Sequence, residues 1–187
     1  MLIVVSPAKA LDFESPLVTK KHSQPAMLER SKELVDVLST KTPQDLQSLM
    51  SISDSLAELN FDRYQDWSIP FTTDNSRPAI LSFSGDTYIG LNAGTTFSER
   101  DFTHAQKTLR ILSGLYGVLR PLDLIQPYRL EMGSKLKTNS SNDLYGFWGT
   151  EISEKLNTDL MESPGEPVLI NLASNEYFKS VNPDEIN

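Results

Sequence analysis

Apolar residues along this chain alternate between short continuous runs and stripes with helical spacing. The run at residues 2–5 meets Ser6-Pro7 directly and predicts a buried strand at the start of the chain. A similar run at residues 168–172 predicts a second strand, after Pro164-Gly165 has ended the preceding helix. Because such runs alternate with helical stripes, we expect an α/β fold, a mixed sheet with surrounding helices.

Two segments carry the sequence signals of a helix N-terminus. Thr42 can cap a helix and is followed by Pro43 and Asp45. Ser98 can cap another and is followed by Asp101. A helix is also expected over residues 25–38.

Two further helices are expected from stripes, and two strands from apolar runs. A helix starting near Ser53 would turn inward a stripe of four residues, Leu56, Leu59, Arg63 and Trp67. The clearest helix covers residues 143–161, with apolar residues at steps of four, Trp148, Ile152, Leu156 and Leu160. Residues 79–83 and 87–89 are expected to form strands around a turn.

Composition limits the possible functions. The 187 residues suit one domain, and a net charge of −8 disfavours general adhesion to nucleic acid or membranes. The absence of cysteine excludes disulfides, zinc fingers, iron–sulfur clusters and thiol nucleophiles, and the 2 histidines lack metal-ligand spacing. Neither a signal peptide nor a membrane-spanning run is evident. We therefore expect a cytoplasmic protein without a metal or cofactor.

The charge reverses over residues 104–137, where 6 Lys/Arg stand against 2 Asp/Glu. Gly114 and Gly117 lie there in an apolar run that fits the turn of a helix-hairpin-helix, in which exposed N–H groups bind a DNA phosphate. Arg110 and Arg120 would add charge beside this turn. The alternative is a strand-to-helix turn that only packs tightly.

Polar motifs follow the strands predicted at residues 2–5 and 168–172. Lys9, in Ser6-Pro7-Ala8-Lys9, would suit a phosphate or carboxylate at the carboxyl edge of a sheet. The Ser-x-x-Lys spacing also matches penicillin-recognising enzymes, but their Lys-Thr-Gly strand is missing, so Ser6 is interpreted as part of a strand-ending turn. Asn171, Ser174 and Lys179 would line the same edge if the two strands are neighbours. Alternatively, Ser174 only caps a helix.

Several segments of the chain resemble the YaaA family of bacterial peroxide stress proteins. They follow one another in the family's order and are Ser6-Pro7-Ala8-Lys9, residues 112–123, residues 127–133, Phe147-Trp148-Gly149 and residues 171–179. The resemblance implies a family-specific α/β fold with a basic cleft and a helix-hairpin-helix element over residues 114–125. It also implies a single domain over residues 1–187 that lacks the Lys- and Arg-rich segment with which family members continue.

The resemblance further implies a cytoplasmic protein that binds DNA and limits the damage done by peroxide and free iron. Phosphate contacts, selective for DNA structure rather than sequence, would come from Lys9, Arg110, Gly114, Gly117, Arg120, Arg129 and Lys179. One alternative is an enzyme acting on a nucleotide or a DNA lesion through Lys9, Asp123 and Glu131. Another is a regulator of free iron. A role without catalysis is preferred, and protein partners are not identified.

Overall fold

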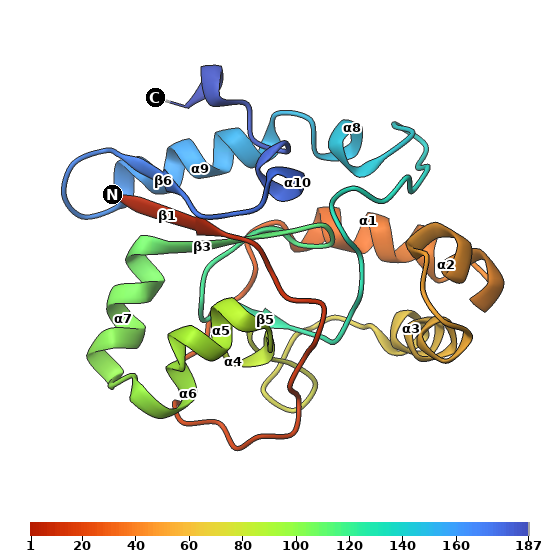
Figure 1. The fold of residues 1–187 in the computed structure, drawn as a ribbon, viewed down its shortest axis with the longest axis horizontal. Helices are drawn as coiled ribbons and strands as arrows, with labels where there is room; N and C mark the ends of the chain where they lie inside the picture. Colours follow the sequence, from red (N-terminus) through yellow and green to blue (C-terminus); the bar gives the residue numbers. More distant parts are fainter. Residues whose placement is uncertain (187) are drawn as a thin grey trace.

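A four-stranded mixed sheet forms the centre of the structure, a computed structural model that describes residues 1–186 (Figure 1). β1 (Leu2–Val5) pairs in parallel with β3 (Leu109–Ser113) on one side and with β6 (Leu169–Asn171) on the other. β4 (Gly117–Leu119) is antiparallel to β3, which gives the order β4-β3-β1-β6. The predicted α/β fold and the strands predicted at residues 2–5 and 168–172 are confirmed.

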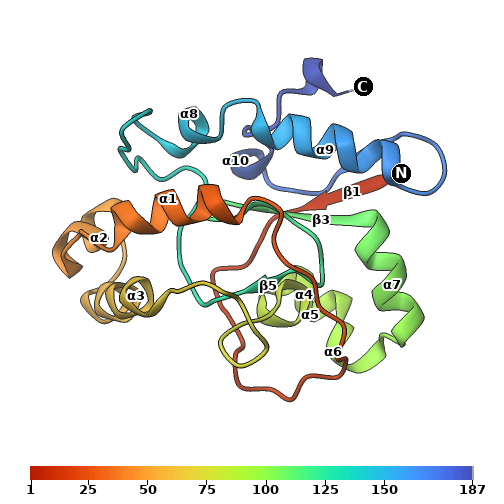
Figure 2. The same ribbon diagram turned by 180° about the vertical axis from the view of Figure 1, so that it is seen from behind.

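Helices lie on both sides of β1 and β3, with α9 on one side and α4 and α5 on the other (Figures 1 and 2). The helices before β3 are α1 (Leu28–Leu38), α2 (Pro43–Met50), α3 (Asp54–Asp66), α4 (Ala79–Ser82), α5 (Asp86–Leu91), α6 (Ala93–Thr96) and α7 (Glu99–Thr108). Those after β4 are α8 (Leu144–Trp148), α9 (Glu151–Glu162) and α10 (Asn175–Phe178), followed by a 3-10 turn at Pro183–Glu185. A small antiparallel pair joins β2 (Arg77–Pro78) to β5 (Leu124–Ile125).

The predicted helix starts are confirmed in detail. Thr42 and Asp45 form a reciprocal capping box at the start of α2, and Ser98 and Asp101 form another at α7. The helix expected over residues 143–161 is divided into α8 and α9 at Gly149, whose φ is +49°. Its apolar stripe is buried on both sides of the break. The hydrophobic spacing therefore identified the buried face but not the break.

Two expectations about local structure are wrong. Residues 79–82 and 86–91 are helical rather than extended. The N–H groups of Ala79 and Ile80 bond to the carbonyls of Asp123 and Pro121, which anchors the first helical turn, and the second begins with bonds from Tyr88 and Ile89 to the carbonyl of Gly85. In α3 the buried face is Ala57, Asn60 and Tyr64, while Leu59 of the expected stripe is 44% exposed.

The helix-hairpin-helix expected over residues 114–125 is also absent. β3 and β4 form an antiparallel hairpin there, with Ile111 opposite Leu119 and Ser113 opposite Gly117. The hairpin is buried from Ile111 to Leu119, and Gly117 takes a φ of +67° that only glycine adopts easily. Long-range pairing of β3 with β1 places the glycines in a tight turn inside the core rather than at an exposed helix start.

Candidate functional site

The carboxyl ends of the parallel strands β1, β3 and β6 meet at one edge of the sheet, where α/β proteins usually bind ligands. Ser6 follows β1 and Ser174 follows β6. The backbone N–H of Ser174 donates to Oγ of Ser6 at 2.9 Å, and the two hydroxyls are 3.3 Å apart. The prediction that both polar motifs reach the same edge is therefore confirmed for Ser6 and Ser174.

Residues 127–133 close this edge and are held on several sides. The hydroxyls of Tyr128 and Ser113 are 2.6 Å apart, and the hydroxyl of Tyr64 donates to the carbonyl of Arg129. The N–H of Gly133 donates to the Glu176 carboxylate at 2.8 Å. These bonds fix the backbone that carries Arg129 and Glu131.

Three charged side chains converge on this segment. The Glu131 carboxylate lies between Lys9, whose Nζ is 3.0 Å from Oε2, and Arg129, whose guanidinium is 3.4 Å from Oε1. Lys9 is 64% exposed and Arg129 only 18%. The Nε of Arg129 is buried and has no hydrogen-bond partner within residues 1–186.

A narrow pocket opens between the end of β1 and this segment. It is lined by Pro7, Ala8, Lys9, Tyr128, Arg129, Leu130, Glu131 and Tyr177. Partial burial, together with the positive charge of Arg129, lowers the pKa of Arg63 on α3. The guanidinium of Arg129 and the ammonium of Lys9 thus face one carboxylate, that of Glu131, and the two cations could instead contact an anion.

Tyrosine hydroxyls supply neutral polar groups around the charges. Tyr88 donates to the carbonyl of Ser6 at 2.9 Å, and burial raises the pKa of Tyr88 well above its usual value. Burial likewise raises the pKa of Tyr128 and of Tyr177. These phenols stay protonated at neutral pH, so they can donate hydrogen bonds but cannot act as anionic bases.

Arg110, predicted to contact phosphate, lies inside the protein. Its Nε donates to Asp159 at 2.7 Å, with side-chain exposures of 6% and 3%, and Lys155 pairs with the other Asp159 oxygen. The guanidinium also donates to the carbonyls of Gln106 and Leu109. This part of the prediction is wrong, because all these bonds are internal and the group is closed to a ligand.

The two glycines make close contacts, but with the protein itself. A Cβ on Gly114 would lie 2.4 Å from the carbonyl oxygen of Leu130, and one on Gly117 would lie 2.6 Å from the sulfur of Met27. Their predicted approach to a phosphate is corrected accordingly. Gly114 instead lets the segment carrying Glu131 lie directly against the hairpin.

The remaining predicted residues differ in availability. Arg120 is 35% exposed but is tied to the buried carboxylate of Asp123 at 3.0 Å and to the carbonyl of Gln24. Asp123 also accepts from Ser23, and burial raises its pKa, so it is a structural acid away from Lys9. Lys179 is exposed, with Nζ 4.9 Å from the centre of the Tyr145 ring.

Three contributors to the edge had no role in the sequence-based site. Arg63 was placed on an apolar stripe, Tyr88 on a strand, and Glu176 only within a helix start. A basic residue inside an otherwise apolar stripe is the signal that could have identified Arg63. Nothing local could have identified Tyr88, because it reaches Ser6 across the fold.

Neither a cluster of metal ligands nor a membrane-spanning helix is found in residues 1–186. In that range no group of three or more histidine and acidic side chains is placed to hold a metal ion. None of the helices described there is long and apolar enough to cross a bilayer.

Comparison with known proteins gives one consistent result. A sequence model for the peroxide stress protein YaaA matches residues 1–187. A UPF0246 protein of Saccharophagus degradans is 56% identical over 187 residues, which is the whole of this chain and 72% of that relative. The single domain and the basic segment beyond residue 187 stay predictions. The match over the full chain, together with this identity, shows that the protein belongs to the YaaA family of peroxide stress proteins.

Proposed function

We propose that this peroxide stress protein binds DNA through phosphate groups at the carboxyl edge of its sheet. The observation that carries the proposal is the meeting of Lys9 and Arg129 at the Glu131 carboxylate, beside the pocket at the end of β1. Phosphate oxygens accept charge-assisted hydrogen bonds from such groups. The cytoplasmic location that this role requires stays a prediction.

The ion pair between Lys9 and Glu131 is compatible with a ligand that replaces it. Lys9 is 64% exposed, and exposed ion pairs contribute only about 0–1 kcal/mol. A phosphate can therefore draw the ammonium away from Glu131 at small cost. Arg129 would stay in place, because its backbone carbonyl is held by Tyr64.

The position of the basic groups favours phosphate contacts over base reading. Lys9 follows a strand and Arg129 lies in a loop, while a base-reading protein usually places a helix in the major groove. Lys179, at the end of the four-residue α10, would add a peripheral contact. We therefore expect similar affinity for unrelated sequences and a preference for particular DNA shapes.

The test is fluorescence anisotropy of a labelled duplex and a labelled four-way junction, titrated with the protein across a salt series. We expect the logarithm of affinity to fall linearly with the logarithm of salt concentration, as phosphate neutralisation requires. Shuffling the duplex sequence should leave affinity unchanged. The absence of binding to either DNA at low salt would remove the proposal.

A second candidate, an enzyme acting on a nucleotide or a DNA lesion, is favoured by the 3.0 Å approach of Lys9 to Glu131. A lysine beside a carboxylate can form an imine with the sugar aldehyde of an abasic site, releasing water, while the acid moves protons. Borohydride reduction would trap that imine on Lys9. Lys9→Arg keeps the charge but not the nucleophile, so loss of trapping with retained DNA binding would support catalysis, and no trapping by the unmodified protein would exclude it.

A further inference from the structure

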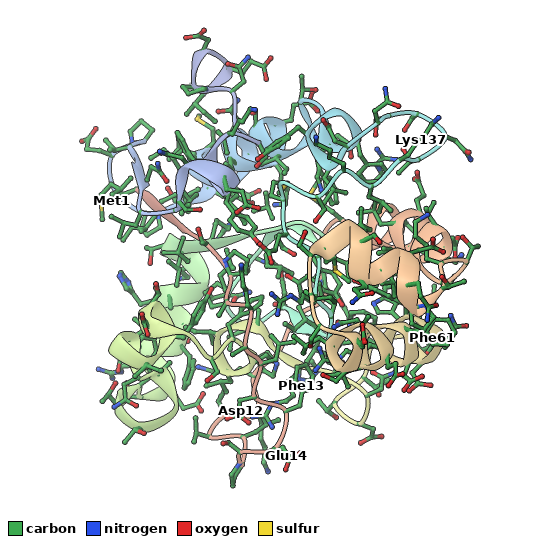
Figure 3. The ribbon with its side chains drawn as sticks, turned by 45° about the vertical axis from the view of Figure 1, so that its right-hand side comes forward. Met1, Asp12, Phe13, Glu14, Phe61 and Lys137 are labelled. Carbon is green, nitrogen blue, oxygen red and sulfur yellow. The ribbon has the colours of Figure 1, made fainter. Side chains whose placement is uncertain are left out.

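A second pocket, of about 420 Å³, lies outside the carboxyl edge, between the loop after Leu11 and the short helices α4 to α6. Pockets of this size hold small molecules. Figure 3 shows Asp12 and Glu14 on this loop at the bottom of the view, below both Met1 and Lys137. None of the residues proposed to contact DNA lines it.

Arg77 gives this pocket its chemical character. Its Nε is buried without a hydrogen-bond partner, and Arg129 at the sheet edge holds the one other buried side-chain polar atom in residues 1–186 with that property. One terminal nitrogen of Arg77 donates to the carbonyl of Ser15 at 2.7 Å, which fixes the guanidinium against the loop. The guanidinium thus lines the pocket as a fixed positive charge.

The acid that lines this pocket is Asp12. Asp12 accepts from the N–H groups of Glu14 and Ser15, both at 2.9 Å, while the printed hydrogen bond of Arg77 goes to the carbonyl of Ser15. A hydrogen bond from the Ser15 side chain, these two backbone bonds and the positive charge of Arg77 lower the pKa of Asp12 to about 2. The carboxylate is thus ionised and hydrogen-bonded within its own loop, and Arg77 interacts with it through charge alone.

The rest of the wall combines apolar side chains with polar residues, among them Ser84, Asn92 and Thr95. Ile80 and Phe83 form buried parts of it, while Val18 and Ile89 stand at the surface with exposures of 50% and 67%. Exposed aliphatic side chains beside a cavity are suited to an apolar body that a bare inorganic ion does not have. We propose that this pocket binds a small organic anion, with its anionic oxygens on Arg77 and its apolar body against Val18 and Ile89.

The glycines around the pocket allow a matched pair of variants. Gly94 lines the pocket, and a Cβ there would meet only Leu81, at 3.9 Å. Gly90 lies on the neighbouring α5, outside the pocket lining, and a Cβ there would meet nothing within 4 Å. Gly94→Leu therefore adds volume at the pocket, while Gly90→Leu adds the same volume elsewhere.

The probes are phenyl phosphate, inorganic phosphate and phenol, titrated into the isotope-labelled protein and followed by amide chemical shifts. We expect saturable shifts at Ser15, Asn92 and Thr95 with phenyl phosphate, at least about tenfold tighter than with either partial probe. Arg77→Gln and Gly94→Leu should each weaken binding about tenfold or more. Gly90→Leu and the exposed-surface variant Arg100→Gln should not.

Two results would overturn the proposal. One is shifts that map to Lys9 and Glu131 instead of this pocket, because the anion would then bind at the sheet edge. The other is unchanged binding in both Arg77→Gln and Gly94→Leu. Since Arg77→Gln also removes a bond to the loop, Gly94→Leu separates loss of the site from a loosened loop. Failure of DNA binding would leave this result untouched.

Discussion

The ammonium of Lys9 lies 3.0 Å from the carboxylate of Glu131, which joins the end of the first strand to a loop far along the chain. Glu131 also contacts Arg129, so a single carboxylate separates two cations at the edge of the sheet. The charge of Glu131 decides how strongly this edge attracts an anion.

Glu131→Gln should raise affinity for DNA at low salt by about tenfold, because it removes the one negative charge between two phosphate-binding groups. Anisotropy titration measures the change. Glu58→Gln, an equal charge change at an exposed position on α3, is the control and should have a much smaller effect. Equal gains in both variants would mean that net charge alone, and not this site, controls binding.

The buried pair of Arg110 and Asp159 should be structural. Asp159→Ala leaves the guanidinium buried without its carboxylate, so we expect the free energy of unfolding to fall by about 3–5 kcal/mol in urea denaturation. The double variant Arg110→Met/Asp159→Leu should lose much less, because no charge is left unpaired. A loss below about 1 kcal/mol in Asp159→Ala would contradict the role given to this pair.

Gly114→Ala should destabilise the protein by about 1–3 kcal/mol, because the new Cβ would lie 2.4 Å from the backbone oxygen of Leu130. The substitution should also shift the amide resonance of Glu131, the residue after Leu130. Gly90→Ala, where a Cβ has open space, is the matched control and should stabilise α5 by about 0.5–1 kcal/mol. Equal stability of the two variants would contradict a close backbone contact between Gly114 and Leu130.

The buried tyrosines predict a specific alkaline transition. Burial raises the pKa of Tyr64, Tyr88, Tyr116, Tyr128 and Tyr177 above the ordinary value of 10.0. Above that pH the unfolded chain loses phenolic protons that the folded chain keeps, so stability falls as pH rises past about 10. Phenolate absorbance should therefore appear together with loss of far-ultraviolet circular dichroism. Gradual ionisation of the folded protein near pH 10 would contradict the burial of these groups.

Local sequence signals predicted those parts of the fold that depend on neighbouring residues. The capping boxes at Thr42 and Ser98 rely on bonds between residues three apart, and both formed as expected. The stripe from Trp148 to Leu160 gave the buried face of α8 and α9, since its period follows from helix geometry.

Long-range contacts decided the rest. The segment around Gly114 and Gly117 has the composition of several kinds of tight turn, and only pairing of β3 with β1 and β4 makes it a buried hairpin. Residues 79–82 were ambiguous as a short apolar run, and bonds to the carbonyls of Pro121 and Asp123 anchor the helical turn that they form.

The candidate site was predictable only in part. Strand ends placed Ser6 and Ser174 together, because both follow parallel strands that proved to be neighbours. The burial of Arg110 was not visible, since its partner Asp159 stands on a helix much later in the chain. Lys9 and Glu131 were both candidates, but their contact needed the whole fold.

The most direct test of the central claim compares Lys9→Ala with Lys32→Ala in the anisotropy salt series. Both lysines are exposed and paired with a carboxylate, Lys9 with Glu131 at 3.0 Å and Lys32 with Asp36 at 2.6 Å, but only Lys9 lies at the carboxyl edge of the sheet. Our account predicts that Lys9→Ala reduces the salt slope by about one, while Lys32→Ala leaves it unchanged. Equal slopes for both variants and the unmodified protein would contradict phosphate binding at this edge.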